Sequence, residues 1–500
     1  MSALFNRRAA LAGLWSSAAT LALADAPGQS PRPRVRTAQA VATSTPTWRP
    51  LSRPSTADMV TQADLGGAVG FVLADLRDGS VLESHAADVG LPPASVMKTV
   101  TTLYALDALG RGFRFATRLL ATGPLADGVV QGDLVLAGGG DPQLVTDDLV
   151  TLAADLRAAG VTGITGRFLI WEGALPYLNE LEPGQLDHFG YNPALSGLNL
   201  NFNRVNFAWK RQGADYAVTM DARSETVVPA VSMARVEVVD RATPLFTYRD
   251  GGGRDDWTVA RAALGNAGSR QLPVRFPGAY AGDVFRTVAR SAGVILPEAV
   301  VVPDLPEGRE VARHESPVLT DILRDMLKYS TNLTAEVLGL TATRARTGQA
   351  RGQRTSALGM EIWARAKAAA QIVCADHSGL SDASHVSAGD MVRLLTAPGV
   401  PAALRPLLKR IAMLDTQGDL LRGVAGAVVA KTGTLDFVTA LAGYQRSASG
   451  QQAAFAIFAA NDERRAVAKA QGVDQPEGAA AWNTRARRLQ QRLLQRWAMR

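Results

Sequence analysis

A change of sequence pattern near residue 116 constrains the fold of this chain more than any other feature. Before it, "GAVGFVLADLRDGSVLESH" predicts two strands joined at Asp78-Gly79, a dipeptide favoured in hairpins, and residues 91–110 predict an apolar helix. From about 116 to 304, short strand-like runs such as "GDLVLAGGG" and "ARVEVVD" alternate with glycine-rich turns. The middle of the chain is therefore expected to be an inserted β-rich region.

After residue 304 helical patterns return. "SPVLTDILRDMLKYSTNLTAEVLGL" has the apolar spacing of helices, with Ser316 as a plausible cap and Pro317 in the first turn. "GAVVAKTGT", "VTALAGYQR" and "AAFAIFAAN" then predict antiparallel strands joined by short turns. Together these segments predict a mixed α/β fold, and 500 residues with 47% hydrophobic content suffice for two or three domains.

The amino-terminal segment is typical of exported proteins. Arg7 and Arg8 precede the apolar run "AALAGLWSSAATLALADA", which ends in small residues suited to cleavage, so residues 1–24 are predicted to be a signal peptide. The alternative, a membrane anchor, is disfavoured because the uncharged stretch before Asp25, residues 9–24, is shorter than the ~18 residues that spanning requires. Residues 25–57, rich in Pro, Ser, Thr and Arg, predict a flexible linker. We therefore expect a periplasmic or cell-envelope protein, exported by the general or the twin-arginine route.

Cysteine content and charge exclude several classes of function. The single cysteine, Cys374, allows neither an internal disulfide nor a thiolate metal cluster and is expected in the core. The net charge of +7 owes much to the helical sequence "TRARRLQQRLLQRWAMR" at the carboxyl terminus. Without a binding motif, this charge predicts a packed helix with a solvated basic face, not a nucleic-acid site. Contact of that face with anionic lipid stays open.

Ser95 and Lys98 stand at the start of the predicted helix in "LPPASVMKTVTTLYALDALG". Residues three apart on a helix share a face, so the hydroxyl and the amine can meet. Such a pair could be a nucleophile and its base. The alternative is a helix-capping serine beside a solvated lysine.

Two further short motifs carry polar groups. In "YSTNLTAE", Ser330 and Asn332 flank Thr331, and alternate positions of a turning segment project to one side. Lys431-Thr432-Gly433-Thr434 ends a predicted apolar strand, where the glycine lets a ligand backbone approach closely. Strand alternation would turn Lys431 and Gly433 to one face and Thr432 to the other. Taken singly, the two strings also fit an ordinary turn and the end of a surface strand.

Together the three motifs point to one family. Ser-x-x-Lys, Ser-x-Asn and Lys-Thr-Gly follow in this order on predicted helix, loop and strand, the signature of penicillin-binding proteins and active-site-serine β-lactamases. Blocks such as "GDLVLAGGGDPQL", "YNPALSGLNLNFN" and "VSAGDMVRLL" extend the similarity over nearly the whole mature chain. The chain resembles the D-alanyl-D-alanine carboxypeptidase/endopeptidase family, the low-molecular-mass class C penicillin-binding proteins of peptidase family S13.

The resemblance implies a fold and a domain order. The expected α/β (α+β) fold is a penicillin-binding-protein/serine β-lactamase-like transpeptidase domain, with an antiparallel sheet flanked by helices and interrupted by inserted β-rich smaller domains. The catalytic domain is then expected over 58–115 and 305–500, and the insert over 116–304. Two positions depart from the family pattern: Thr331, where members vary, and His377 in "DHSGLS", where we expect a glycine. We expect His377 to narrow or repolarise the rim of the cleft.

The resemblance also implies a role for each motif residue. Ser95 is the expected nucleophile and Lys98 its base, kept neutral by burial and by the charge of Lys431. Ser330 is expected to pass a proton to the departing D-alanine, and Asn332 to hold the amide of the acyl chain. The side chains of Lys431, Thr432 and Thr434 are expected to bind the substrate carboxylate, and Gly433 to admit the substrate backbone. The backbone N–H groups of Ser95 and Thr434 are expected to form the oxyanion hole.

The expected activity is cleavage of peptidoglycan stem peptides through an acyl-enzyme, with β-lactams as acylating inhibitors and with no cofactor or metal. A Ser-His-Asp hydrolase is disfavoured because the chain has five histidines and no Gly-x-Ser-x-Gly string, and a zinc hydrolase because it has no His-Glu-x-x-His string. A β-lactamase-like hydrolase and a non-catalytic cell-wall scaffold stay as alternatives. The preference between carboxypeptidase and endopeptidase action, and the oligomeric state, stay open.

Overall fold

The computed structural model describes residues 55–414 and 427–500. The predicted signal peptide, 1–24, lies outside the described residues, as does the predicted linker up to residue 54. Helix α2 (Thr56–Ala63) begins within the range predicted as linker, because Ser55 and Asp58 form a capping box that satisfies its first N–H groups. In the described part of the chain, no helix combines the length and apolar character needed to cross a membrane.

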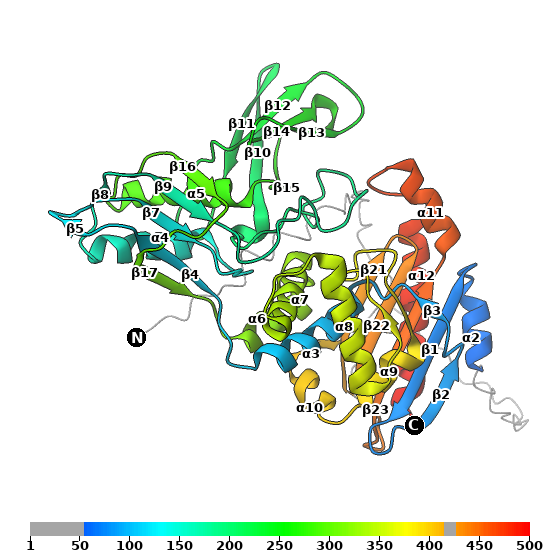
Figure 1. The fold of residues 1–500 in the computed structure, drawn as a ribbon. Coiled ribbons are helices and arrows are strands. Elements are labelled where there is room, and N and C mark those ends of the chain that lie inside the picture. Colours follow the sequence, from blue (N-terminus) through cyan, green and yellow to red (C-terminus); the bar gives the residue numbers. More distant parts are fainter. Residues whose placement is uncertain (1–54, 415–426) are drawn as a thin grey trace, which may run out of the picture.

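A six-stranded antiparallel sheet forms the centre of the domain predicted to be catalytic, in the order β2-β1-β23-β22-β21-β20 (Figure 1). The predicted first hairpin and the predicted closing strands thus belong to one sheet, since β1 pairs directly with β23, Val69 opposite Ala459. The bounds are β1 Ala68–Asp75, β2 Val81–His85, β20 Lys409–Ile411, β21 Ala427–Leu435, β22 Val438–Arg446 and β23 Gln452–Ala460.

Helices cover both faces of this sheet. Strand β23 shows why: Phe455 and Ile457 point to one apolar core and Phe458 to the other, as the two-residue period of a strand requires. The larger core packs against α3 Met97–Leu109, α6 Leu319–Tyr329, α7 Asn332–Thr347, α8 Gln353–Ala368, α9 Ala388–Thr396 and α10 Val400–Leu404. The opposite core packs against α2, α11 Asp462–Gln471 and α12 Ala479–Ala498. The fold class predicted from the sequence is confirmed.

A separate β-rich body is inserted between α3 and α6 and lies beside the catalytic domain (Figure 1). Its main sheet has the order β16-β9-β7-β4-β17 and packs against α4 and α5. The last strand, β17, lies beyond the predicted end of the insert at 304, because it returns to pair with β4. The bounds are β4 Ala116–Ala121, β7 Leu134–Ala137, α4 Thr146–Ala158, β9 Phe168–Trp171, α5 Pro277–Ser291, β16 Ala299–Val302 and β17 Arg309–Glu315.

Two three-stranded sheets are nested inside this insert, between β9 and α5. Their orders are β11-β10-β15 and β12-β14-β13. Their bounds are β10 Arg204–Gln212, β11 Asp215–Asp221, β12 Ala234–Val239, β13 Phe246–Asp250, β14 Asp255–Ala260 and β15 Ala267–Pro273. Six short strands form two small sheets: β3 Gly90–Leu91, β18 Ile372–Val373 and β19 His385–Ser387; β5 Leu125–Ala126, β6 Val129–Val130 and β8 Gly163–Ile164.

Helix α12 is fixed to the sheet by an aromatic cluster that supplies a stability test. Trp497 is 1% exposed and its ring lies 6.0 Å from that of Phe71 and 5.8 Å from that of Phe455, both on sheet strands. Trp497→Ala should lower the free energy of unfolding by about 3 to 5 kcal/mol, because a large apolar cavity remains. Equilibrium urea unfolding followed by circular dichroism measures it. Val467→Ala on α11, where the side chain is 54% exposed, is the control, and an equal loss there would contradict the assignment.

Candidate active site

Ser95 lies in a 3₁₀ turn, η1 (Ala94–Val96), directly before α3. The residue before it, Ala94, has φ 44°, in the left-handed region that non-glycine residues rarely adopt. Two glycines pack against this turn: a Cβ on Gly379 would lie 1.9 Å from the Ala94 carbonyl oxygen, and one on Gly433 would lie 3.0 Å from the Ser95 nitrogen. The turn is thus held by close backbone approaches, and the N-cap of α3 is Val96, so Ser95 is not a capping residue.

Lys98 is the buried centre of the site. Its Nζ donates hydrogen bonds to Ser95 Oγ at 2.9 Å, to Asn332 Oδ1 at 2.8 Å and to the Ser378 carbonyl oxygen at 2.8 Å. The side chain is 0% exposed, which excludes the alternative of a solvated lysine. Burial lowers the pKa of Lys98 to about 8.

The charges around Lys98 differ from the expectation. Asp376 and Glu336 act on its pKa in the opposite sense to burial, since carboxylates favour the ammonium form. We predicted that the charge of Lys431 would lower the pKa of Lys98. Instead, the charge of Lys98 lowers the pKa of Lys431, as the second-largest cause after burial. Burial, not a second ammonium, is therefore what moves Lys98 towards its neutral form.

The second and third motifs meet on the other side of the site. Ser330 ends α6 with φ 63°, and Thr331 is the N-cap of α7, so the predicted turn is the junction of two helices. Lys431 Nζ donates to Ser330 Oγ at 2.9 Å and to the Thr432 carbonyl oxygen at 2.6 Å. The Lys431 side chain is buried, and its pKa lies well below the ordinary lysine value because of burial and the charges of Lys98 and Lys409.

The last motif occupies the end of β21. Lys431 and Gly433 are buried, whereas Thr432 is half-buried and Thr434 is exposed. Strand β20 pairs with β21 only as far as Ala430, so among the described residues the β21 edge beyond it has no strand partner on that side. That edge lies against the η1 turn at Gly433 and can offer backbone hydrogen bonds to an extended peptide.

A network around Glu336 supports the site, and none of the three motifs includes it. Glu336 is fully buried and its carboxylate accepts hydrogen bonds from the N–H groups of His377 and Ser378. His377 Nδ1 lies 2.9 Å from the same carboxylate, and the Gln353 side chain also hydrogen-bonds to it. Burial alone would raise the pKa of Glu336, but the hydrogen bond and charge of His377 hold it below its ordinary value. The network places the Ser378 carbonyl against Lys98. The sequence signal that could have identified Glu336 is its spacing of four residues from Asn332, which puts both side chains on one face of a helix.

The expectation that His377 lies at the rim of the cleft is wrong. Its ring is 0% exposed, with Nε2 3.0 Å from Ser356 Oγ. A Cβ on Gly339 would lie 2.0 Å from the ring, so the imidazole fills the space that this glycine leaves beside α7. His377 therefore supports the interior of the site and does not shape its mouth.

The insert also reaches the site. Asn332 Nδ2 donates a hydrogen bond of 3.1 Å to the carbonyl oxygen of Tyr191, in the segment between β9 and β10. No motif marks Tyr191, because a backbone carbonyl can come from any residue type. The amide of Asn332 is thus held between the catalytic domain and the insert.

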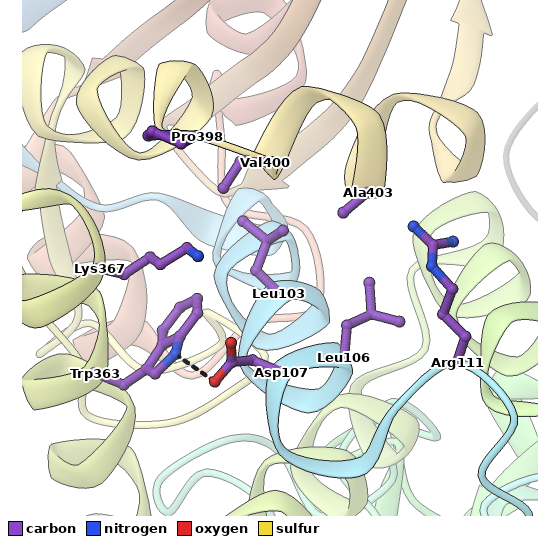
Figure 2. A pocket seen from close by; sticks show the side chains of 10 residues that line it. Leu103, Leu106, Asp107, Arg111, Trp363, Lys367, Pro398, Val400 and Ala403 are labelled. Carbon is purple, nitrogen blue, oxygen red and sulfur yellow. Dashed lines mark hydrogen bonds between the residues drawn. The ribbon is translucent and has the colours of Figure 1, made fainter.

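Helix α3 also borders a cavity near its carboxyl-terminal end, whereas Ser95 and Lys98 lie at its amino-terminal end. This cavity of about 230 Å³ is lined by the end of α3, by α8 and by α10, including Leu103, Trp363 and Val400 (Figure 2). Trp363 Nε1 donates to Asp107 Oδ2 at 3.2 Å across one wall. None of the three motifs contributes a lining residue to it.

Most of the chain matches one known protein family. A family model described as the D-Ala-D-Ala carboxypeptidase 3 (S13) family matches residues 53–480. The chain belongs to this family. The family and the class of enzyme predicted from the sequence, a serine-type D-Ala-D-Ala carboxypeptidase, are thereby confirmed.

Individual relatives of this S13 protein agree. It is 29% identical over 431 residues to the D-alanyl-D-alanine carboxypeptidase of Actinomadura sp. (strain R39), covering 78% of this chain and 77% of the relative. It is 24% identical to the D-alanyl-D-alanine carboxypeptidase DacB of Haemophilus influenzae, covering 80% and 87%. The crystal structure of penicillin binding protein 4 (dacB) from Haemophilus influenzae superimposes with a TM-score of 0.70 at 21% identity, covering 88% of this chain and 100% of that one.

The contact between β21 and the η1 turn gives a direct test. In Gly433→Ala the new methyl group would lie 2.8 Å from the Pro93 carbonyl oxygen and 3.0 Å from the Ser95 nitrogen, so the turn must move. Acylation by a labelled penicillin should fall by about 10²-fold, the scale of a 1 Å misplacement in an active site. Gly265→Ala, where an added Cβ meets nothing within 4 Å, should label normally. Normal labelling of Gly433→Ala would show that the approach is unimportant.

Proposed function

We propose that this protein cleaves the terminal D-Ala-D-Ala bond of peptidoglycan stem peptides through an acyl-enzyme on Ser95. The observation that carries the proposal is the hydrogen bond of 2.9 Å between Ser95 Oγ and the buried Nζ of Lys98. A nucleophile with a base in contact, and the base oriented by further partners, is the arrangement that acyl transfer requires. Asn332 and Ser378 are those partners.

Acylation follows from the positions of these groups. Neutral Lys98 takes the proton of Ser95 Oγ as the oxygen attacks the carbonyl carbon of the scissile peptide bond. The N–H groups of Ser95 and Thr434 stabilise the oxyanion. When the C–N bond breaks, the amine of the terminal D-alanine receives a proton through Ser330. Water then hydrolyses the ester on Ser95 and regenerates the free hydroxyl.

Recognition of the substrate carboxylate falls to the end of β21. Lys431 is buried, and burial disfavours its ammonium form; an arriving carboxylate has the opposite effect, because an opposite charge favours that form. Thr432 and Thr434 add hydroxyl donors, and Gly433 admits the substrate backbone. Lys431 is also hydrogen-bonded to Ser330, so carboxylate binding and the proton path to the leaving amine share one pair of side chains.

Two proposals concern the setting of the reaction. The segment 1–24 is proposed to export the protein to the periplasm or cell envelope, where the substrate lies. The chain between the two catalytic segments is proposed to form separate domains that shape access for bulky wall material. Incubation with monomeric and with cross-linked peptidoglycan distinguishes carboxypeptidase from endopeptidase action, since one releases free D-alanine and the other splits cross-links.

The nucleophile can be tested with a covalent probe. A labelled penicillin should attach to Ser95 in peptide mapping, because β-lactam acylation uses the same nucleophile and base as the peptide substrate. Ser95→Ala should remain folded and unlabelled. Label on another residue, or no label on the folded wild-type protein, would remove the assignment, and the second result would favour the cell-wall scaffold. Rapid loss of label with release of hydrolysed penicillin would favour the β-lactamase-like alternative.

The base can be tested through pH. With a pKa of about 8, Lys98 is mostly protonated below that pH, so the acylation rate should fall as pH drops through this value. Lys98→Arg keeps the charge but cannot release its proton, and should abolish acylation. Stopped-flow acylation across the acid limb measures both. Near-wild-type acylation by Lys98→Arg would show that the base lies elsewhere.

A further inference from the structure

The side-chain amide of Asn332 has one orientation that satisfies both of its ends. Its Oδ1 accepts from Lys98 Nζ at 2.8 Å, and its Nδ2 donates to the Tyr191 carbonyl oxygen at 3.1 Å. If the amide were reversed, Nδ2 would face the donor Nζ and Oδ1 would face an acceptor oxygen, so both contacts would become repulsive. The Tyr191 carbonyl therefore selects the orientation in which Asn332 presents its oxygen to Lys98.

Tyr191 belongs to a segment, 179–192, that contains no helix or strand. Gln353 donates to its Leu181 carbonyl oxygen and Arg204 to its Gly190 carbonyl oxygen, and a buried arginine binds it at three further points. Arg275, between β15 and α5, is 1% exposed. Its guanidinium donates to three carbonyl oxygens of this segment: Asn179 at 2.9 Å, Asn192 at 2.9 Å and Asp187 at 3.1 Å. Asn192 is the neighbour of Tyr191, so one of the three bonds fixes the peptide next to the carbonyl that Asn332 meets.

Packing alone does not explain an arginine at this position. Burying an ionised guanidinium costs free energy, and an apolar side chain of similar volume often stabilises a fold as well or better. What the planar, five-donor group supplies is a fixed geometry for several acceptors at once. Here all three acceptors are backbone oxygens of one irregular segment, and the Tyr248 ring, 5.9 Å away, covers the guanidinium.

We propose that Arg275 is a positioning residue for the reaction: by fixing segment 179–192 it holds the Tyr191 carbonyl against Asn332 and so orients the Asn332 oxygen towards Lys98. The inference rests on the proposed function of Ser95 and Lys98. It makes the insert part of the catalytic apparatus, because residues of the insert fix the orientation of Asn332, whose oxygen accepts a hydrogen bond from Lys98.

The proposal predicts a change in the base itself. Without the Tyr191 contact the Asn332 amide is free to turn, and Lys98 loses an acceptor that favours its ammonium form. The remaining charged groups near Lys98, which are Asp376, Glu336 and Lys431, are unchanged. The acid limb of the acylation profile should therefore move to lower pH while the plateau rate falls.

The test compares acylation of the full-length protein by a labelled penicillin across the acid limb. Arg275→Met removes the three hydrogen bonds at similar volume and should lower the plateau rate by about 10²-fold and shift the midpoint to lower pH. Arg275→Lys, which keeps the charge without the fork, should give an intermediate rate. The control is Arg249→Met in the same insert, where the side chain is 80% exposed and pairs with Asp256. The control should leave rate and midpoint unchanged.

A purely structural role gives a different result. Partial unfolding lowers the fraction of protein that is labelled but leaves the midpoint and the rate of the labelled fraction unchanged, which would overturn the proposal. If Arg275→Met does not fold, Arg275→Lys decides, since it keeps a charged donor at this position but loses the planar fork that serves three acceptors. A wild-type rate and midpoint in Arg275→Lys would then overturn the proposal. Absence of label on wild-type Ser95 would instead refute the proposed function.

Discussion

The burial of one lysine side chain among three acceptors is the constraint on which the site depends. Lys98 Nζ donates to Ser95 in the η1 turn, to Asn332 at the start of α7 and to the Ser378 carbonyl in the loop before β19. An amine without these partners could not be buried at acceptable cost, and an exposed one would keep its ordinary pKa. The same contacts that make burial possible therefore also allow the lowered pKa that the proposed base requires.

The features that the sequence predicted are local ones. Ser95 and Lys98 are three residues apart, in the η1 turn and the first turn of α3, and the burial alternation of β21 separates Lys431 from Thr432. Spacing alone therefore indicates which groups can face a common cleft. The strands of the central sheet also have the continuous apolar sequence that their burial on both faces requires. The periods of helices and strands were therefore enough to predict the fold class and which motif side chains share a face.

The features that the sequence did not predict depend on packing between distant segments. His377, in the loop between β18 and β19, is buried because Gly339 on α7 leaves space for its ring. The pKa of Lys98 reflects desolvation, which no local pattern reports, and Tyr191 acts through its backbone, which has no side-chain signature. The end of the inserted sheet was placed too early because β17 is identified only by its partner, β4.

The pairing of β1 with β23 has a consequence for the order in which the molecule is completed. Strand β1 and the η1 turn leave the ribosome early, whereas β21, which completes the site, and β23, which joins β1 to the rest of the sheet, come at the far end of the chain. Contacts of such sequence separation form late, because long loops must close first. The insert, whose sheet is closed by β17, can assemble before them. A chain interrupted before β21 would lack both Lys431 and the strand that packs against the Ser95 turn, so the proposed site is complete only once synthesis is nearly finished.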